Sequence, residues 1–259
     1  MADFNSIKKR FDDYTDNKSS VWKSHFTWNG LDGNFPKNSI SIVNFFKKTG
    51  EKVILKKNSV NNLWKEIERL SKNYITWIMQ NNTYNDIEQT DLRDFFIGAM
   101  GEYFFYNLLT DLHVLVVKNQ LSGKLNRVDF DKVMPRLSDE KDMGVDFTCM
   151  SSINDTACPS VIQVKFWNPY INNQLIYSMV SNMFTDAMLN DYINKNDSHN
   201  MYVCWLGDMD KVSKQLKSYP MLYNRIIFID GKTLDDNINQ KNLLFWARLI
   251  DKFNEISNM

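Results

Sequence analysis

The order of the apolar segments after residue 86 constrains the fold of this chain more than any other feature. Long segments with apolar residues at helical spacing alternate with short runs rich in Val, Ile and Phe, which are typical of buried strands. In chain order they are a helix over residues 91–112, strands over 112–118, 144–151 and 160–167, a helix over 172–195, strands over 200–207 and 224–231, and a helix over 242–257. This order predicts an α/β fold with a central mixed sheet flanked by helices on both faces.

The connections between these segments carry further expectations. Turn-forming residues between the strands over 144–151 and 160–167 predict a hairpin. Thr90 or Asp91 is expected to cap the helix over 91–112. The residues that follow the strand over 112–118 are expected to form a polar loop.

The first 85 residues lack this regular order. We therefore expect an N-terminal accessory region over residues 1–85 and a second domain over residues 86–259. Within the accessory region, residues 39–55 suggest a hairpin that turns at Thr49 and Gly50, and residues 59–81 predict a helix. The apolar face of that helix is expected to comprise Leu63, Ile67, Leu70, Tyr74, Trp77 and Ile78.

Composition excludes several classes of function. The chain has 31 basic and 31 acidic residues, so any affinity for nucleic acid must come from a local patch. Its three cysteines and three histidines lack metal-ligand spacing, and no GxGxxG or GxxxxGK[ST] loop is present. Cysteine usage fits a reducing cytosol, and no segment resembles a signal peptide or a membrane span, so we expect a cytoplasmic protein.

Four polar residues interrupt apolar elements at places where burial would penalise them. They are Glu102 in the helix over 91–112, Asp146 in the strand over 144–151, and Gln163 and Lys165 in the strand over 160–167. Gln163 and Lys165 share one face of their strand because side chains alternate. If the two strands pair as an antiparallel hairpin, Asp146 lies beside both of them.

This set of side chains suits one kind of chemistry. The carboxylates of Asp146 and Glu102 and the amide of Gln163 offer oxygen ligands of the kind that Mg²⁺ or Mn²⁺ prefers. A bound cation and Lys165 would both oppose negative charge on a phosphodiester undergoing hydrolysis. Lys165 would orient the attacking water, help to deprotonate it, or stabilise the phosphate oxygens, and the sequence does not choose between these roles.

The runs GEYFFYNLL, DMGVDF and IQVKFW, each on the expected helix or strand, resemble the core of the PD-(D/E)xK (restriction-endonuclease-like) nuclease superfamily. The resemblance covers about residues 90–235 and implies a restriction-endonuclease-like core. It implies that Asp146 is the central metal ligand, that Gln163 fills the second acidic position and that Lys165 is the catalytic lysine. Glu102 would be the helix carboxylate, acting through water, and the backbone carbonyl of Val164 a further ligand.

Two positions depart from the family pattern. Val145 stands where a proline usually precedes the central aspartate, and Gln163 replaces the more frequent Glu or Asp. The Q-x-K form resembles the Mrr-type branch found in type IV restriction enzymes. One negative charge fewer implies weaker cation binding: a one-metal site, a need for Mn²⁺ or DNA to complete the metal shell, or a lost activity. Asp142 is either a supporting residue or part of a solvated acidic loop.

Other residues are candidates for contact with DNA. Trp167 lies close to the expected site and is a candidate for stacking on a base or sugar. We also consider a basic hairpin that contacts phosphates, against the ordinary reading of a solvated face. Its residues would be Lys47, Lys48, Lys52, Lys56 and Lys57.

These features together predict a metal-dependent endonuclease that cuts double-stranded DNA in restriction or anti-phage defence. Residues 1–85 would contact DNA, a second copy or a partner, and cutting both strands favours a homodimer. One alternative is an effector subunit that is gated by a separate helicase, ATPase or sensor. Another is a catalytically inactive nuclease fold that serves as a binding module.

Overall fold

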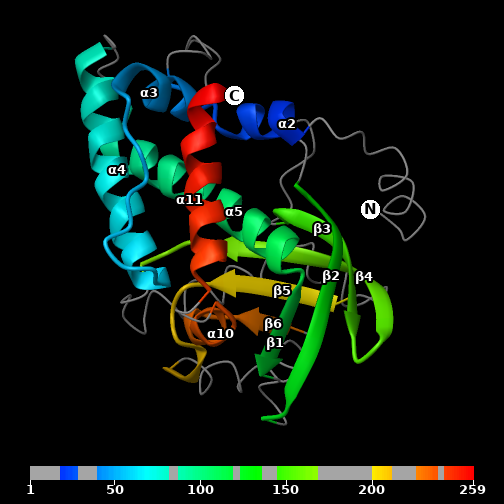
Figure 1. The fold of residues 1–259 in the computed structure, drawn as a ribbon. Helices are drawn as coiled ribbons and strands as arrows, with labels where there is room; N and C mark the ends of the chain where they lie inside the picture. The colour runs from blue at the N-terminus through cyan, green and yellow to red at the C-terminus, as the bar shows by residue number, and fades with distance from the viewer. Residues whose placement is uncertain are drawn as a thin grey trace. The chain divides into compact units, whose positions relative to one another are not determined.

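The computed structural model describes residues 18–28, 40–81, 87–118, 123–135, 145–168, 200–211, 226–238 and 242–259. These residues fall into two compact units (Figure 1). The sheet unit contains the described residues of 105–239. The helical unit contains those of 16–104 together with 240–259.

A six-stranded mixed sheet forms the centre of the sheet unit. Its strands are β1 (Val114–Lys118), β2 (Leu125–Pro135), β3 (Phe147–Ile153), β4 (Thr156–Lys165), β5 (Asn200–Trp205) and β6 (Ile226–Ile229). They lie side by side in chain order, with antiparallel pairing from β1 to β4 and parallel pairing from β4 to β6. The edge strands β1 and β6 approach each other, so the sheet curls nearly into a barrel (Figure 1).

The predicted hairpin between β3 and β4 is confirmed, and both strands reach closer to the turn than expected. Only Asn154 and Asp155 separate Ile153 from Thr156, and both have positive φ angles, of 49° and 67°. Two consecutive left-handed residues are the hallmark of a type I′ turn, whose twist matches that of the strands it joins. The turn therefore fixes how β3 and β4 pair.

The expected polar loop after β1 is wrong, because part of it forms strand β2. Val128 and Phe130 are buried, while Arg127 and Asp131 on either side of them are exposed. The charged side chains thus occupy the outward positions of a strand with alternating exposure. Between Val128 and Val133 its apolar residues are therefore separated by charged ones, and the sequence shows no continuous apolar run there. Lys132 has a φ of 49° beside a register shift, as expected for a β-bulge.

Helix α5 (Gln89–Leu112) starts before either residue that was expected to cap it. The carbonyl of Glu88 accepts the N–H groups of Asp91 and Leu92, so Thr90 and Asp91 lie inside the first turn and the capping prediction is wrong. In the sheet unit, the C-terminal part of α5 packs on one face of the sheet. The ring of Phe105 lies 6.3 Å from that of Phe166.

Helix α10 (Gly231–Asn237) connects the two edges of the sheet. Asp230 caps its N-terminus by accepting the N–H of Thr233 at 2.8 Å, and also accepts the N–H of Met209 at 3.0 Å, next to the short helix η1 (Met209–Lys211). At the other end, Asn237 bonds both backbone groups of Val116 in β1, at 2.8 and 2.9 Å. This amide satisfies part of an otherwise open strand edge.

The helical unit contains α2 (Lys18–His25), α3 (Ile42–Thr49), α4 (Val60–Asn81), α11 (Leu243–Glu255), the short η2 (Ile256–Asn258) and the first part of α5. The hairpin expected over 39–55 is wrong, because its first half is the helix α3. Ser41 caps this helix and Gly50 ends it with a φ of 69°. A Ser before and a Gly after an apolar run are helix boundary signals, and here they outweigh the strand-like composition.

Helix α4 confirms the helix expected over 59–81. Five of its six predicted face residues are buried, and Trp77 is half-buried. The helix packs on α3 and α5 through aromatic rings: Phe96 lies 5.0 Å from Tyr74 and 6.0 Å from Phe45. The hydroxyl of Tyr74 also donates to the carbonyl of Ile40.

The described residues test two further predictions only in part. The helix expected over 172–195 lies outside the described residues, so flanking of the sheet on both faces remains a prediction. Among the described helices, none combines the length and the apolar character that crossing a bilayer would require.

We predict that Asp230→Ala lowers the free energy of unfolding by about 2 kcal/mol, because two buried N–H groups lose their acceptor. Urea denaturation of the purified protein measures the change. Asp236→Ala removes an exposed carboxylate from the same helix and serves as the control. Equal stability of the two variants would contradict the capping role.

Candidate active site

Asp146 lies directly before β3 and is bound to β4 by two hydrogen bonds. Its N–H donates to the carbonyl of Ile162 at 3.0 Å, and its Oδ2 accepts the N–H of Val164 at 2.6 Å. The second bond ties the half-buried carboxylate itself to the strand backbone. The pairing of β3 with β4 therefore fixes the position of the Asp146 carboxylate.

Gln163 and Lys165 lie on the strand to which Asp146 is bound. Because Asp146 contacts the backbone on both sides of Gln163, it lies beside that residue. Both Gln163 and Lys165 are half-buried and project from the same face of β4. Within the described part of the chain, neither side chain forms a hydrogen bond or an ion pair. The structure thus brings together three of the four predicted site residues.

Glu102 belongs to the helical unit, so its relation to these three residues remains a prediction. Its Oε2 lies 3.7 Å from Nδ1 of His25 in α2, with side chains exposed by 24% and 13%. The ring of His25 lies 5.3 Å from that of Trp22. A lone histidine far from Glu102 in the sequence gave no signal for this pair.

The negative charge of Asp146 affects the pKa of a cysteine on the neighbouring strand β5. Cys204 pairs in register with Val164 and is fully buried. Burial raises the pKa of the Cys204 thiol well above its ordinary value, and the negative charge of Asp146 raises this pKa further. Burial likewise raises the pKa of Cys149, with a smaller contribution from Cys158.

Two more polar side chains lie on the sheet face that carries Gln163 and Lys165. Trp205 pairs in register with Lys165, and Thr148 pairs with Val161. Both are buried, and within the described residues neither Nε1 of Trp205 nor Oγ1 of Thr148 has a hydrogen-bond partner. A Cβ on Gly207 would lie 1.9 Å from the Trp205 ring, so a side chain there would displace the indole. Neither residue was a candidate from the sequence.

The donor set fits Mg²⁺ or Mn²⁺ in kind but not in number. Asp146 and Gln163 offer hard oxygen donors, as these cations prefer. However, no group of three His, Cys, Asp or Glu residues suited to a metal occurs in the described part of the chain. A cation held here would need further oxygen ligands, for which Glu102, the Val164 carbonyl, phosphate and water remain predictions.

The other predicted residues have separate outcomes. Asp142 lies outside the described residues. Trp167 is half-buried, and its N–H donates to the carbonyl of Lys165 at 2.9 Å, so the chain turns immediately after β4. The five lysines predicted to contact phosphates are exposed, but they lie on α3 and on the connection to α4 and not on a hairpin. Their contact with phosphate remains a prediction.

Comparison with known proteins gives little further information. No family model and no curated protein matches the chain. Among solved structures, it is similar to the MspJI restriction endonuclease in complex with a 27-mer oligonucleotide, with 9% identity and a TM-score of 0.35. The match covers 78% of this chain and 36% of that chain. These values are too low to establish a common fold.

We predict that one of the three cysteines reacts rapidly with a thiol reagent in the folded protein. Cys158 is half-buried, whereas Cys149 and Cys204 are buried and their raised pKa keeps them protonated near neutral pH. Reaction with a chromogenic disulfide at pH 8 measures the fast phase, and Cys158→Ser should abolish it. Rapid reaction of all three thiols would contradict the burial of the sheet behind the site.

Proposed function

We propose that the protein is an endonuclease that hydrolyses phosphodiester bonds of double-stranded DNA with the help of a divalent cation. One observation carries this proposal. Asp146 is held against the β4 backbone beside Gln163 and Lys165, whose polar ends have no partner among the described residues. A carboxylate, an amide and an ammonium group thus gather at one end of a hairpin.

The lack of partners for Gln163 and Lys165 among the described residues supports a role in binding an anion. A half-buried ammonium group is costly to keep without a counter-charge, and a structural lysine would normally have a carboxylate beside it. Asp146 already accepts a backbone N–H, so part of its hydrogen-bonding capacity serves to position it. A phosphate group would satisfy Lys165 and Gln163 at once.

We assign the roles from the chemistry of each side chain. Asp146 and Gln163 would hold the cation, together with the Val164 carbonyl and with Glu102 from α5. When bound, a divalent cation supplies Lewis acidity and neutralises charge on the reacting phosphate. Lys165 supplies a second positive charge, which stabilises the phosphate oxygens as negative charge builds up on them.

The wider setting is part of the same proposal. The Q-x-K arrangement supports membership in the Mrr-type branch of the PD-(D/E)xK superfamily and a role in restriction or anti-phage defence. A homodimer would place one such site on each strand of a duplex. Residues 1–85 would add contacts to DNA, to the second copy or to a gating partner.

A second candidate function is a nuclease fold that binds DNA without cutting it. The observation that favours it is that Asp146 is the one carboxylate placed at the site by the described residues, which contain no group of three His, Cys, Asp or Glu suited to a metal. In that case Lys165 would still bind phosphate, and the protein would bind DNA equally well with and without divalent cations.

We predict that the purified protein nicks or linearises supercoiled plasmid with Mg²⁺ or Mn²⁺, and that EDTA abolishes this activity. Lys165→Ala and Asp146→Ala should each reduce the rate by at least about 100-fold, because each removes charge stabilisation from the reacting phosphate. Lys232→Ala and Asp236→Ala, which alter exposed residues of α10, are the matched controls. Cleavage that persists in both site variants would refute the assignment. Absence of cleavage by the wild type favours the binding module or a partner-gated effector.

We also predict that Gln163→Glu strengthens Mn²⁺ binding by roughly tenfold, because a second carboxylate adds attraction that desolvation only partly offsets. Calorimetric titration of the protein without DNA measures the affinity. Gln89→Glu introduces the same charge at an exposed position and controls for a general electrostatic effect. Equal affinities in the two variants would place the cation away from Gln163.

A further inference from the structure

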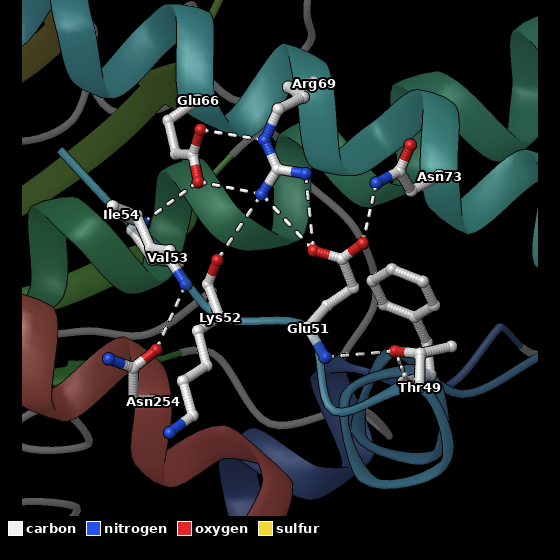
Figure 2. Close-up of polar contacts among 10 residues, drawn as sticks. Thr49, Glu51, Lys52, Val53, Ile54, Glu66, Arg69, Asn73 and Asn254 are labelled. Atoms are coloured by element: carbon white, nitrogen blue, oxygen red, sulfur yellow. Dashed lines mark hydrogen bonds and ion pairs between the residues drawn. The ribbon is translucent and has the colours of Figure 1, made fainter. Parts of the chain in front are cut away.

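The connection between α3 and α4 has its backbone bound by side chains from two helices. The N–H of Val53 donates to Oδ1 of Asn254 at 3.0 Å, and the N–H of Ile54 donates to Oε1 of Glu66 at 2.9 Å. Arg69 donates to the carbonyl of Lys52 at 3.4 Å (Figure 2). In the described chain, this segment pairs with no strand, so these side chains take the place of a sheet partner.

Arg69 is the centre of this network. Its guanidinium donates to both carboxylate oxygens of Glu66 at 2.9 Å and to Oε2 of Glu51 at 3.3 Å. Asn73 donates to the other oxygen of Glu51 at 2.7 Å. The hydrogen bond to Glu66 is the main cause that raises the pKa of Arg69 above its ordinary value. Figure 2 shows the guanidinium engaged on several sides, so it is a poor candidate for binding an external anion.

Five lysines lie on or next to this bound connection. They are Lys47 and Lys48 in the last turn of α3, and Lys52, Lys56 and Lys57 beyond it. All five are exposed, and none forms an ion pair with a described carboxylate. With Arg69, this surface carries six positive charges against two carboxylates of the same network, Glu51 and Glu66. This surface therefore holds an excess of positive charge in a chain whose formal net charge is zero.

Exposure alternates along the connection. Lys52, Ile54 and Lys56 are exposed, while Val53 between the first two is buried. Residues two apart on an extended segment project to the same side, so Lys52 and Ile54 share the exposed side of this segment. Ile54 is 65% exposed between two lysines, which suits an apolar contact with a sugar.

A purely structural reading explains only part of this surface. Lys47 and Lys48 stabilise the C-terminal end of the α3 dipole and need no external partner. That reading does not apply to Lys52, Lys56 and Lys57, which lie outside any helix. Nor does it explain why a segment with three unpaired charges is fixed by bonds to α4 and α11.

We propose that residues 47–57 form a preorganised surface that binds the phosphate backbone of duplex DNA, with Lys52, Lys56 and Lys57 as the contacts. Arg69 is a positioning residue that holds the segment and does not touch the DNA. The choice of DNA over other polyanions rests on the proposed function. The fixed backbone lowers the entropy that ordering a flexible basic loop would cost on binding.

The test is equilibrium binding of a fluorescent DNA duplex in EDTA, so that no cleavage occurs. The triple variant Lys52→Gln, Lys56→Gln and Lys57→Gln should bind more than about tenfold more weakly, and the salt slope of log K should fall by about 2.7 if each lysine neutralises one phosphate. The control is Lys118→Gln, Lys124→Gln and Lys232→Gln, which removes the same charge from exposed positions of the sheet unit. Equal losses in both triple variants, or a loss seen only with RNA duplex, overturn the proposal.

A second variant tests the positioning role. Arg69→Met keeps every lysine but removes the bonds to Glu51, Glu66 and Lys52. Amide hydrogen exchange at Val53 and Ile54 should become faster, and DNA should bind several-fold more weakly. Weaker binding with unchanged exchange would mean that Arg69 contacts DNA directly, contrary to the proposal.

These outcomes are separable from the nuclease proposal. If the wild type binds DNA through the three lysines but never cleaves plasmid, the surface stands and the proposed function fails. If the wild type cleaves plasmid and the triple variant binds with unchanged affinity and salt slope, the proposed function stands and the surface fails.

Discussion

The register of the β3–β4 hairpin determines which side chains meet at the candidate site. The turn at Asn154 and Asp155 sets this register, and the bond from the Val164 N–H to Asp146 fixes its far end. Because side chains alternate along a strand, a slip by one residue would turn Gln163 and Lys165 to the opposite face. The arrangement of the site therefore depends on the pairing of β3 with β4, whose register begins at the turn.

The same pairing puts polar groups in surroundings that do not satisfy them. Lys165 and Gln163 have no partner within the described residues, and neither do the polar atoms of the neighbouring Trp205 and Thr148. A fold selected only for stability would pair these groups or replace them, since each unsatisfied buried group costs about 1–3 kcal/mol. Nε1 of Trp28 and Nε1 of Trp246 also lack a partner elsewhere in the described chain, so it is the position of Gln163 and Lys165 beside Asp146 that supports a bound ligand.

The sequence predicted those parts of the fold that depend on local pattern. The hairpin that pairs Asp146 with β4 and the buried strands β5 and β6 follow from short apolar runs and turn residues, and the apolar face of α4 follows from helical periodicity. Strand β2 was missed because charged residues fill its outward positions, and α3 was mistaken for a strand because its apolar run is short. Contacts between distant side chains, such as His25 with Glu102, have no local signature and required coordinates.

The distribution of paired and unpaired charges links the candidate site to the basic surface. Arg69, Arg93 and Arg127 all bind carboxylates, as expected of a rigid fork that matches their geometry. Lys165 and the lysines of residues 47–57 form no such pairs among the described residues. Lys118 pairs with Asp210, so the contrast with arginine holds for Lys165 and the lysines of residues 47–57 and not for every lysine. Under the proposed function, the phosphates of DNA are the anions that each of these two groups of ammonium ions would bind.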